Sequence, residues 1–305
     1  GTTEAMIDTI DGTLFQRMII HASASIESQK QSINELNVFP VPDGDTGTNM
    51  SMTIGTAAAE AGKGPVPAVG QAASSAASAL LRGARGNSGV ILSLLFRGLS
   101  KGLKELSSAD GAALAAAMNE GVSAAYKAVM NPTEGTILTV SRLAAARAAE
   151  AAGEQNSVEY MLEAAIAAGQ IALADTVNQN PVLKKAGVVD AGGKGYLIIL
   201  QGMLDELRGI AAPEVAGGGA SLQDKADFAA LSQEEITFAF DTVFIVRKTV
   251  NKSLDPLRVY LNSIGDSLVI GEDDDMFKVH VHTNIPGNAL IEAQNYGTLE
   301  LAKIE

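Results

Sequence analysis

The apolar residues in the first two thirds of the chain recur at helical spacing. Within residues 7–33, for example, Ile7, Ile10, Leu14 and Met18 fall on one side of a helix. Glycine, proline and cap residues divide this part of the chain into similar segments. We expect eight helices, openings included, at residues 7–33, 46–60, 67–82, 83–102, 109–129, 133–153, 157–177 and 190–207. This pattern predicts an all-α bundle of antiparallel helices.

Beyond residue 209 the pattern changes. Residues 210–233 contain Pro213 and a run of glycines, which predicts a linker between a first domain, residues 1–209, and a second, residues 234–305. The second domain mixes alternating strand patterns with short helical ones. Its expected elements are a strand at 235–248, a helix at 254–264, strands at 267–271 and 276–283, a helix at 286–296 and a strand at 299–304. The order β-α-β-β-α-β predicts a small α+β domain with a ferredoxin-like fold.

The connections between the helices are unequal in composition. Short connections make successive helices antiparallel, so every second helix begins at the same end of the bundle. The helices that begin there are opened by residues 43–49, 83–89, 133–136 and 190–195, all rich in Gly, Ser, Thr or Asp. The remaining connections, at residues 62–66, 107–111 and 153–156, are plainer. This asymmetry predicts a functional site at one end of the bundle.

The segment from Asn37 to Met50 has the strongest chemical character. Gly44 permits a tight turn between Asp43 and Asp45, whose carboxylates can then converge on one point. Mg²⁺ commonly takes one or two carboxylates together with substrate phosphates. Polar side chains follow at the start of a helix, where backbone N–H groups favour anions; they are Thr46, Thr48 and Asn49. The alternative is a capped turn with solvated aspartates.

A second polar opening lies at residues 83–89. Gly86, Asn87, Ser88 and Gly89 offer close backbone approach, an amide and a hydroxyl, which suit the terminal phosphates of a nucleotide. Arg85 is a candidate clamp for developing negative charge. The alternative is a glycine-rich cap that serves helix packing. Neither a P-loop nor a dinucleotide-binding motif occurs in the sequence.

Two further caps could contact the same ligand. Thr136 could bond a phosphate or ribose, and Asp190 could contact the base or sugar. Each alone is more simply explained as a helix cap.

In the second domain, His280 and His282 are two residues apart on a predicted strand and share one face. Two imidazoles suit Zn²⁺, which needs at least one more ligand, and Asp241 on the first strand is the best candidate. The alternative is a pair of partly exposed histidines without a metal.

Composition limits the partners. The net charge of −13 argues against nucleic acid or an anionic membrane, although a cation and backbone donors would still allow ATP to bind. The chain has no cysteine, which excludes disulfides and fits a reducing cytoplasm. We find neither a signal peptide nor an apolar run long enough to span a bilayer.

Long motifs carry a family resemblance. Residues 37–50, 83–89, 134–140 and 186–193 closely resemble the kinase domain of DhaL-like proteins, and more narrowly bacterial fatty acid kinase A, which binds ATP in the fatty acid kinase system. Residues 278–283 and 296–297 are similar to the middle domain of the same family. The resemblance covers essentially the whole chain, and the third, carrier-engaging domain of the family is expected to be missing after Glu305.

The resemblance implies an eight-helix barrel with Mg²⁺-ATP at one rim. It assigns magnesium to Asp43 and Asp45, with Asn37 at the position of a further aspartate in glycerone kinases. Nucleotide roles carry over to the following matching residues: Thr46, Asn49, Asn87, Ser88, Gly89, Thr136, Asp190 and Gly192. The middle domain of the family resembles a zinc module of one cysteine and two histidines, which places Asp241 at the cysteine position.

The resulting hypothesis is a cytoplasmic kinase. It transfers the γ-phosphoryl group of Mg²⁺-ATP to the carboxylate of a fatty acid that a DegV-like carrier protein presents, and it gives an acyl phosphate that enters phospholipid metabolism. A homodimer is possible. The alternatives are a non-catalytic scaffold that senses nucleotide and the ATP-binding component of a glycerone (dihydroxyacetone) kinase.

Overall fold

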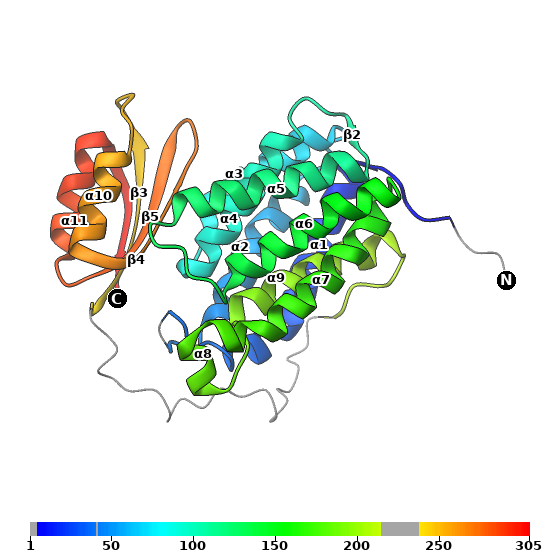
Figure 1. Cartoon of the computed structure of the whole chain (residues 1–305). Coiled ribbons are helices and arrows are strands. Elements are labelled where there is room, and N and C mark those ends of the chain that lie inside the picture. Colours follow the sequence, from blue (N-terminus) through cyan, green and yellow to red (C-terminus); the bar gives the residue numbers. More distant parts are fainter. Residues whose placement is uncertain (1–4, 41, 215–237) are drawn as a thin grey trace.

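A computed structural model describes residues 5–40, 42–214 and 238–305 (Figure 1). The predicted linker, residues 210–233, lies outside these ranges except for residues 210–214. The first part of the chain is helical. Its elements are β1 (Ile10–Asp11), α1 (Gly12–Asn34), α2 (Thr46–Ala61), α3 (Val69–Gly83), α4 (Gly86–Gly102), β2 (Ser108–Ala109), α5 (Gly111–Ala128), α6 (Ile137–Glu154), α7 (Val158–Gln179), α8 (Pro181–Ala186) and α9 (Ala191–Leu207).

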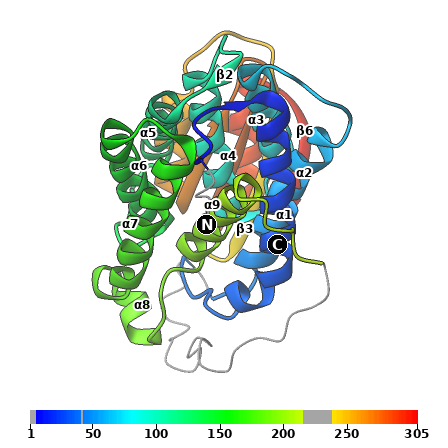
Figure 2. The same ribbon diagram turned by 90° about the vertical axis from the view of Figure 1, so that its right-hand side faces the viewer.

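The helices form a closed ring. Each long helix packs against the next in sequence, α7 packs against α9, and α9 packs against α1. Figure 2 views this arrangement from one end, with α1, α2 and α3 on one side and α5, α6 and α7 on the other. Small residues allow close contact: a Cβ atom on Gly98 of α4 would overlap the backbone of Gly121 in α5. The many alanines of the sequence thus serve closely packed helices.

The first helix is shorter than predicted. Residues 7–11 continue the apolar spacing but are extended, because Ile10 and Asp11 pair with Ala109 and Ser108. The Asp11 side chain then accepts a hydrogen bond of 2.8 Å from the N–H of Leu14 and so begins α1. The same pairing explains why α5 begins at Gly111 rather than at residue 109.

Helix α8 was not predicted. The side chain of Asn180 caps it by accepting from the N–H of Val182 at 3.1 Å, and Gly187 ends it with a φ of +72°. The Asn-Pro pair therefore begins a short helix as well as ending α7. Among the described helices, we find none with the length and hydropathy needed to cross a membrane.

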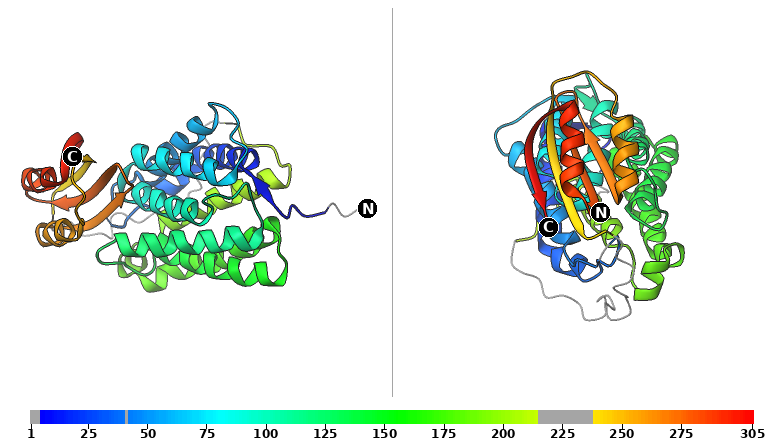
Figure 3. Two further views of the ribbon diagram at one scale, coloured as in Figure 1. Left: turned by 90° about the horizontal axis from the view of Figure 1, so that it is seen from above. Right: turned by 90° about the vertical axis from the view of Figure 1, so that its left-hand side faces the viewer.

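The second part of the chain is an antiparallel sheet with helices on one face (Figure 3). Its elements are β3 (Phe240–Lys248), α10 (Asp255–Ile264), β4 (Gly265–Glu272), β5 (Met276–Thr283), α11 (Pro286–Ala293), the 3-10 helix η4 (Gln294–Tyr296) and β6 (Gly297–Ile304). The strand order is β4-β5-β3-β6, and every neighbouring pair is antiparallel. The predicted order of strands and helices is confirmed.

The inner side of this small domain has its own apolar core. Phe244 and Val246 of β3 pack with Leu257 and Leu261 of α10 and with Ala289 of α11. Because strand side chains alternate, the neighbouring residues point to the opposite face, toward the helical part. A buried cluster of Leu81, Ile245 and Met276 joins the two parts.

The sheet docks at the end of the helical ring. Backbone groups of Val129 and Val269 form an isolated β-bridge, and the Arg258 guanidinium donates to the carbonyl oxygen of Ala128 at 3.3 Å. Figure 1 shows the sheet at this end and the N-terminus at the other.

Candidate functional site

The openings of four helices meet at the end of the ring that carries the sheet. A small cavity of about 30 Å³ is lined by Asn37, Pro40, Asp43, Asp45, Thr46, Asn49, Gly86, Asn87, Ser88, Asp241, His280 and His282. A larger cavity of about 300 Å³ shares Pro40, Asn87 and Ser88 with it and also contacts Thr136, Asp190 and Gly192. The prediction that alternate helix openings gather at one end is confirmed.

The plainer connections gather at the opposite end. The N–H of Gly12 donates to the carbonyl oxygen of Pro67 at 2.7 Å, and the N–H of Val69 donates to Ser107 at 3.0 Å. The Asn156 amide donates to the Asp110 carboxylate at 3.1 Å. These connections are satisfied by one another, whereas the openings at the first end face a cavity.

A buried amide shapes the aspartate loop. The Oδ1 atom of Asn37 accepts hydrogen bonds from the backbone N–H groups of Asp45, at 2.9 Å, and Thr46, at 3.0 Å. Gly44 has a φ of +68°, which glycine adopts without strain. Asp45 is the N-cap of α2, but its carboxylate makes no capping hydrogen bond. Both aspartate side chains are therefore left for the cavity.

The cavity concentrates negative charge. Partial burial, together with the charges of Asp45 and Asp241, raises the pKa of Asp43 to about 6. Burial also raises the pKa of Asp45, to which the charge of Asp241 contributes. Carboxylates from two parts of the chain therefore repel one another across one small space. A divalent cation would relieve this repulsion, and its preferred oxygen ligands are present.

The start of α4 offers groups for an anion. Gly86 has a φ of +65°, and a Cβ atom there would lie 2.5 Å from the Asn49 amide nitrogen. The Oδ1 atom of Asn87 is buried and has no hydrogen-bond partner among the described residues. The first N–H groups of a helix also lack intrahelical partners. This opening therefore has unsatisfied polar groups beside the carboxylates.

Thr136 and Asp190 both act as caps. The Thr136 hydroxyl accepts from the N–H of Leu138 at 3.3 Å, and the Asp190 carboxylate accepts from the N–H of Gly193 at 2.8 Å. Burial raises the pKa of Asp190 to about 7, although its backbone hydrogen bonds act in the opposite direction. Both residues line the larger cavity while they cap, so the two readings of the sequence are compatible.

Three predicted site residues are placed elsewhere. The Thr48 hydroxyl accepts from the Asn34 amide at 3.0 Å and so faces α1, and Gly89 packs against Thr53. The Arg85 side chain is exposed and lines neither cavity. These residues support the loops, and the structure does not bring their side chains to the site.

Sequence reasoning missed Lys278 and Pro40. Pro40 lines both cavities. Lys278 precedes His280 by two residues on β5 and therefore shares its face, a signal that was present in the sequence. Its ammonium group donates to the carbonyl oxygen of Ala84. Burial lowers the pKa of Lys278 to about 8, and the nearby charge of Arg85 adds to this effect.

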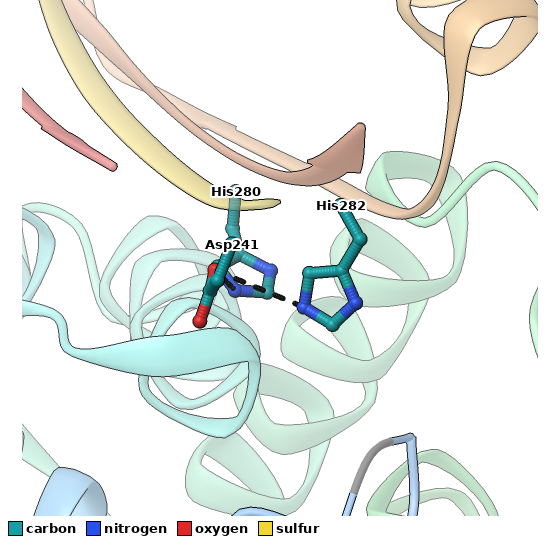
Figure 4. Close-up of side chains that lie close together, drawn as sticks. All are labelled: Asp241, His280 and His282. Carbon is teal, nitrogen blue, oxygen red and sulfur yellow. Dashed lines mark ion pairs between the residues drawn. The ribbon is translucent and has the colours of Figure 1, made fainter. Parts of the chain in front are cut away.

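The second-domain cluster converges on one carboxylate oxygen (Figure 4). The Nε2 atom of His280 lies 2.6 Å and that of His282 lies 3.7 Å from Oδ1 of Asp241. One ligand atom from each residue lies within 4.8 Å of the others, which is close enough to share a metal. Burial would raise the pKa of Asp241, but the hydrogen bond and charge of His280 hold it below its usual value.

The outer atoms of the cluster are unequally supported. The Nδ1 atom of His282 lies 3.7 Å from the Asp266 carboxylate, whereas Nδ1 of His280 is buried without a partner among the described residues. Burial lowers the pKa of His282, which favours its neutral, metal-binding form. The donor set therefore fits a metal such as zinc, with an incomplete outer shell.

Comparisons with known proteins agree with this architecture. Residues 40–205 match the DAK2 domain, and residues 237–305 match the middle domain of FakA-like fatty acid kinase proteins. The chain is 40% identical over 309 residues to protein YloV of Bacillus subtilis, covering 98% of this chain and 56% of that protein. It is 39% identical over 307 residues to an uncharacterized protein of Staphylococcus saprophyticus, with the same coverages.

A solved structure is also similar. The crystal structure of the dihydroxyacetone kinase of C. freundii matches with a TM-score of 0.48 and 19% identity, over 67% of this chain and 36% of that one. The present chain spans about half the length of the curated relatives it matches. More than half of its residues fall within the first family match. The chain belongs to the DAK2-domain family and joins its DAK2 domain to a FakA-like middle domain.

Proposed function

We propose that this chain is the nucleotide-binding part of a fatty acid kinase. It would transfer the γ-phosphoryl group of Mg²⁺-ATP to the carboxylate of a fatty acid that a DegV-like carrier presents. The observation that carries the proposal is the shared wall of Asn87 and Ser88, which separates an acidic cavity from a larger, partly apolar one. A nucleotide needs such a pair of spaces, one for its phosphates and one for its base and ribose.

The larger cavity suits the nucleoside. Its apolar lining comes from both parts of the chain and includes Ile91, Leu138, Leu268 and Val269. Polar groups beside these residues, such as Thr136 and Asp190, could orient a ribose or a base.

The smaller cavity suits the phosphates and their cation. Asp43 and Asp45 are the residues that would hold magnesium, since their pKa values are raised in its absence. The bound ion would neutralise phosphate charge during transfer. Asn37 is a weaker ligand candidate, because its oxygen already accepts two backbone hydrogen bonds. The Gly86–Ser88 backbone and the Asn87 side chain would orient the terminal phosphates.

The acceptor requires little activation. A fatty acid carboxylate is ionised at neutral pH, so no general base is needed. One carboxylate oxygen forms a bond to the γ-phosphorus while the bond from that phosphorus to the bridging oxygen breaks, and its electron pair leaves with ADP. The protein would contribute positioning and charge stabilisation by fixed N–H groups.

The proposal includes the finer features of the fold and the second metal. The closed ring of helices supports an eight-helix barrel, and the strand order β4-β5-β3-β6 supports a ferredoxin-like second domain. Asp241, His280 and His282 are the proposed zinc ligands. We keep a boundary near residues 209 and 234, which two separate apolar clusters support.

An acceptor assay tests the function. The full-length protein is incubated with Mg²⁺-ATP and either fatty acid with its carrier, dihydroxyacetone with its carrier, or no acceptor, and ADP and acyl phosphate are measured. We expect ADP and acyl phosphate only with the fatty acid carrier. Turnover with dihydroxyacetone alone would establish the glycerone kinase alternative, and binding of ATP without turnover would indicate a nucleotide-sensing scaffold.

A further inference from the structure

A lysine of the second domain is attached to the phosphate-side loop of the first. Lys278 lies on β5, is 3% exposed, and donates through Nζ to the carbonyl oxygen of Ala84. Ala84 ends α3 and stands two residues before Gly86. A single side chain thus connects the central part of the sheet to the turn that opens α4.

Stability alone does not explain this lysine. No carboxylate forms an ion pair with Lys278 in the part of the chain that the structure describes, and the nearest charge acting on it is that of Arg85, which has the same sign. Burying an ammonium group without a counter-ion is costly, and an apolar side chain of similar volume is often as stable or more so. The position therefore points to a role in the site.

The same turn is held from its other side by α2. The N–H of Arg85 donates to Oγ1 of Thr53 at 3.0 Å, and the Thr53 hydroxyl donates to the carbonyl oxygen of Asn49 at 2.7 Å. Gly86 also packs against the side chain of Asn49. Thr53 and Lys278 thus fix the turn between two elements that are more than 200 residues apart in sequence.

The strand that carries Lys278 is firmly placed. Its neighbour β4 packs against the helical part at Gly271, where an added Cβ atom would lie 2.9 Å from the Leu81 side chain. Met276, two residues before Lys278 on β5, packs with Leu81 and Ile245. These contacts lie next to the Ala84 hydrogen bond, so β5 can act as a fixed support.

We propose that Lys278 is a positioning residue that holds the Ala84–Gly86 turn in the conformation that receives the terminal phosphates of the nucleotide. Docking of the second domain thereby sets the phosphate affinity of the first. This inference rests on the proposed function, because it assigns the turn to a nucleotide. Lys278 acts through the backbone of Ala84 and not by contact with the reacting atoms.

The test compares two ligands that differ in their phosphates. Wild type, Lys278→Met and the exposed control Lys252→Met are titrated calorimetrically with a non-hydrolysable Mg²⁺-ATP analogue and with AMP. Loss of one hydrogen bond from a charged donor should weaken binding of the analogue by about tenfold or more in Lys278→Met. Binding of AMP should change by less than about twofold, and the melting temperature should stay equal or rise. The control should match wild type.

A second variant covers the case in which Lys278→Met fails to fold. Thr53→Val removes the other attachment of the turn with little change in shape, and the same selective loss of the ATP analogue is expected. Equal affinity of the variants and wild type for the analogue would overturn the inference, as would a parallel loss for AMP. If wild type itself binds no nucleotide, the proposed function fails, which is a distinct result.

Discussion

The hydroxyl oxygen of Ser88 lies 3.3 Å from the position that a Cβ atom on Gly192 would occupy. The starts of α4 and α9 thus touch, although more than 100 residues separate them in sequence. An added methyl group would also meet Ile137 at 3.4 Å. The space between these helix starts is part of the larger cavity, so its width should control nucleotide binding.

We therefore expect Gly192→Ala to weaken nucleotide binding by several-fold while the protein remains folded. Alanine has a helix propensity up to about 1 kcal/mol better than glycine, which offsets part of the crowding. The matched control is Gly153→Ala, because a Cβ atom there meets nothing within 4 Å. Calorimetric titration of both variants decides: equal affinities would show that the contact between α4 and α9 does not shape the site.

Replacement of Asn37 should destabilise the aspartate loop. Asn37→Ala leaves the buried N–H groups of Asp45 and Thr46 without their acceptor, at a cost of about 1–3 kcal/mol for an unsatisfied buried group. The exposed Asn178→Ala should change the free energy of unfolding by less than about 0.5 kcal/mol. Urea denaturation measures both, and an Asn37→Ala variant as stable as the control would contradict the role assigned to this amide.

Asp190 should make stability depend on pH. Its pKa is raised to about 7 in the folded state, so the folded protein holds a proton that the unfolded chain releases near pH 4. The stabilisation from this group is complete at low pH and is lost as the pH rises toward 7. Relative to Asp190→Asn, wild type should lose unfolding free energy between about pH 4.5 and 7 and level off above it. Urea denaturation across this range would refute the assignment if the difference between the two proteins stayed constant.

Asp45 should be required for turnover but not for folding. Its carboxylate makes no capping bond and lies in repulsion with other carboxylates, so Asp45→Ala should abolish carrier-dependent ADP release and leave the melting temperature at or above that of wild type. The exposed Asp274→Ala should keep full activity. Full activity of Asp45→Ala would remove the proposed role.

Metal content should depend on the second-domain histidines. Wild type loaded with Zn²⁺ and dialysed should retain about one equivalent by elemental analysis, because three ligands converge in Asp241, His280 and His282. His280→Ala should retain little, whereas His21→Gln, whose side chain instead contacts Glu206, should retain as much as wild type. Equal zinc in wild type and His280→Ala would exclude the site.

Much of this architecture could be predicted from local patterns. The spacing of apolar residues located the long helices, and helix parity brought Asp43, Ser88, Thr136 and Asp190 to one end. The errors arose where pairing partners are distant in sequence, since the extension of residues 7–11 depends on Ala109. Local patterns also could not reveal that Asp241 and His280 line the same cavity as Asp43, because that depends on how the sheet docks. Docking depends on packing at Leu81 and Gly271, which no single segment encodes.

The most direct test of the central claim is an anomalous diffraction measurement on crystals grown with Mn²⁺, in place of Mg²⁺, and a non-hydrolysable ATP analogue. We predict a manganese peak between Asp43 and Asp45, with the terminal phosphates at Gly86–Ser88 and the base in the larger cavity. A nucleotide bound elsewhere, or manganese away from both aspartates, would contradict the account.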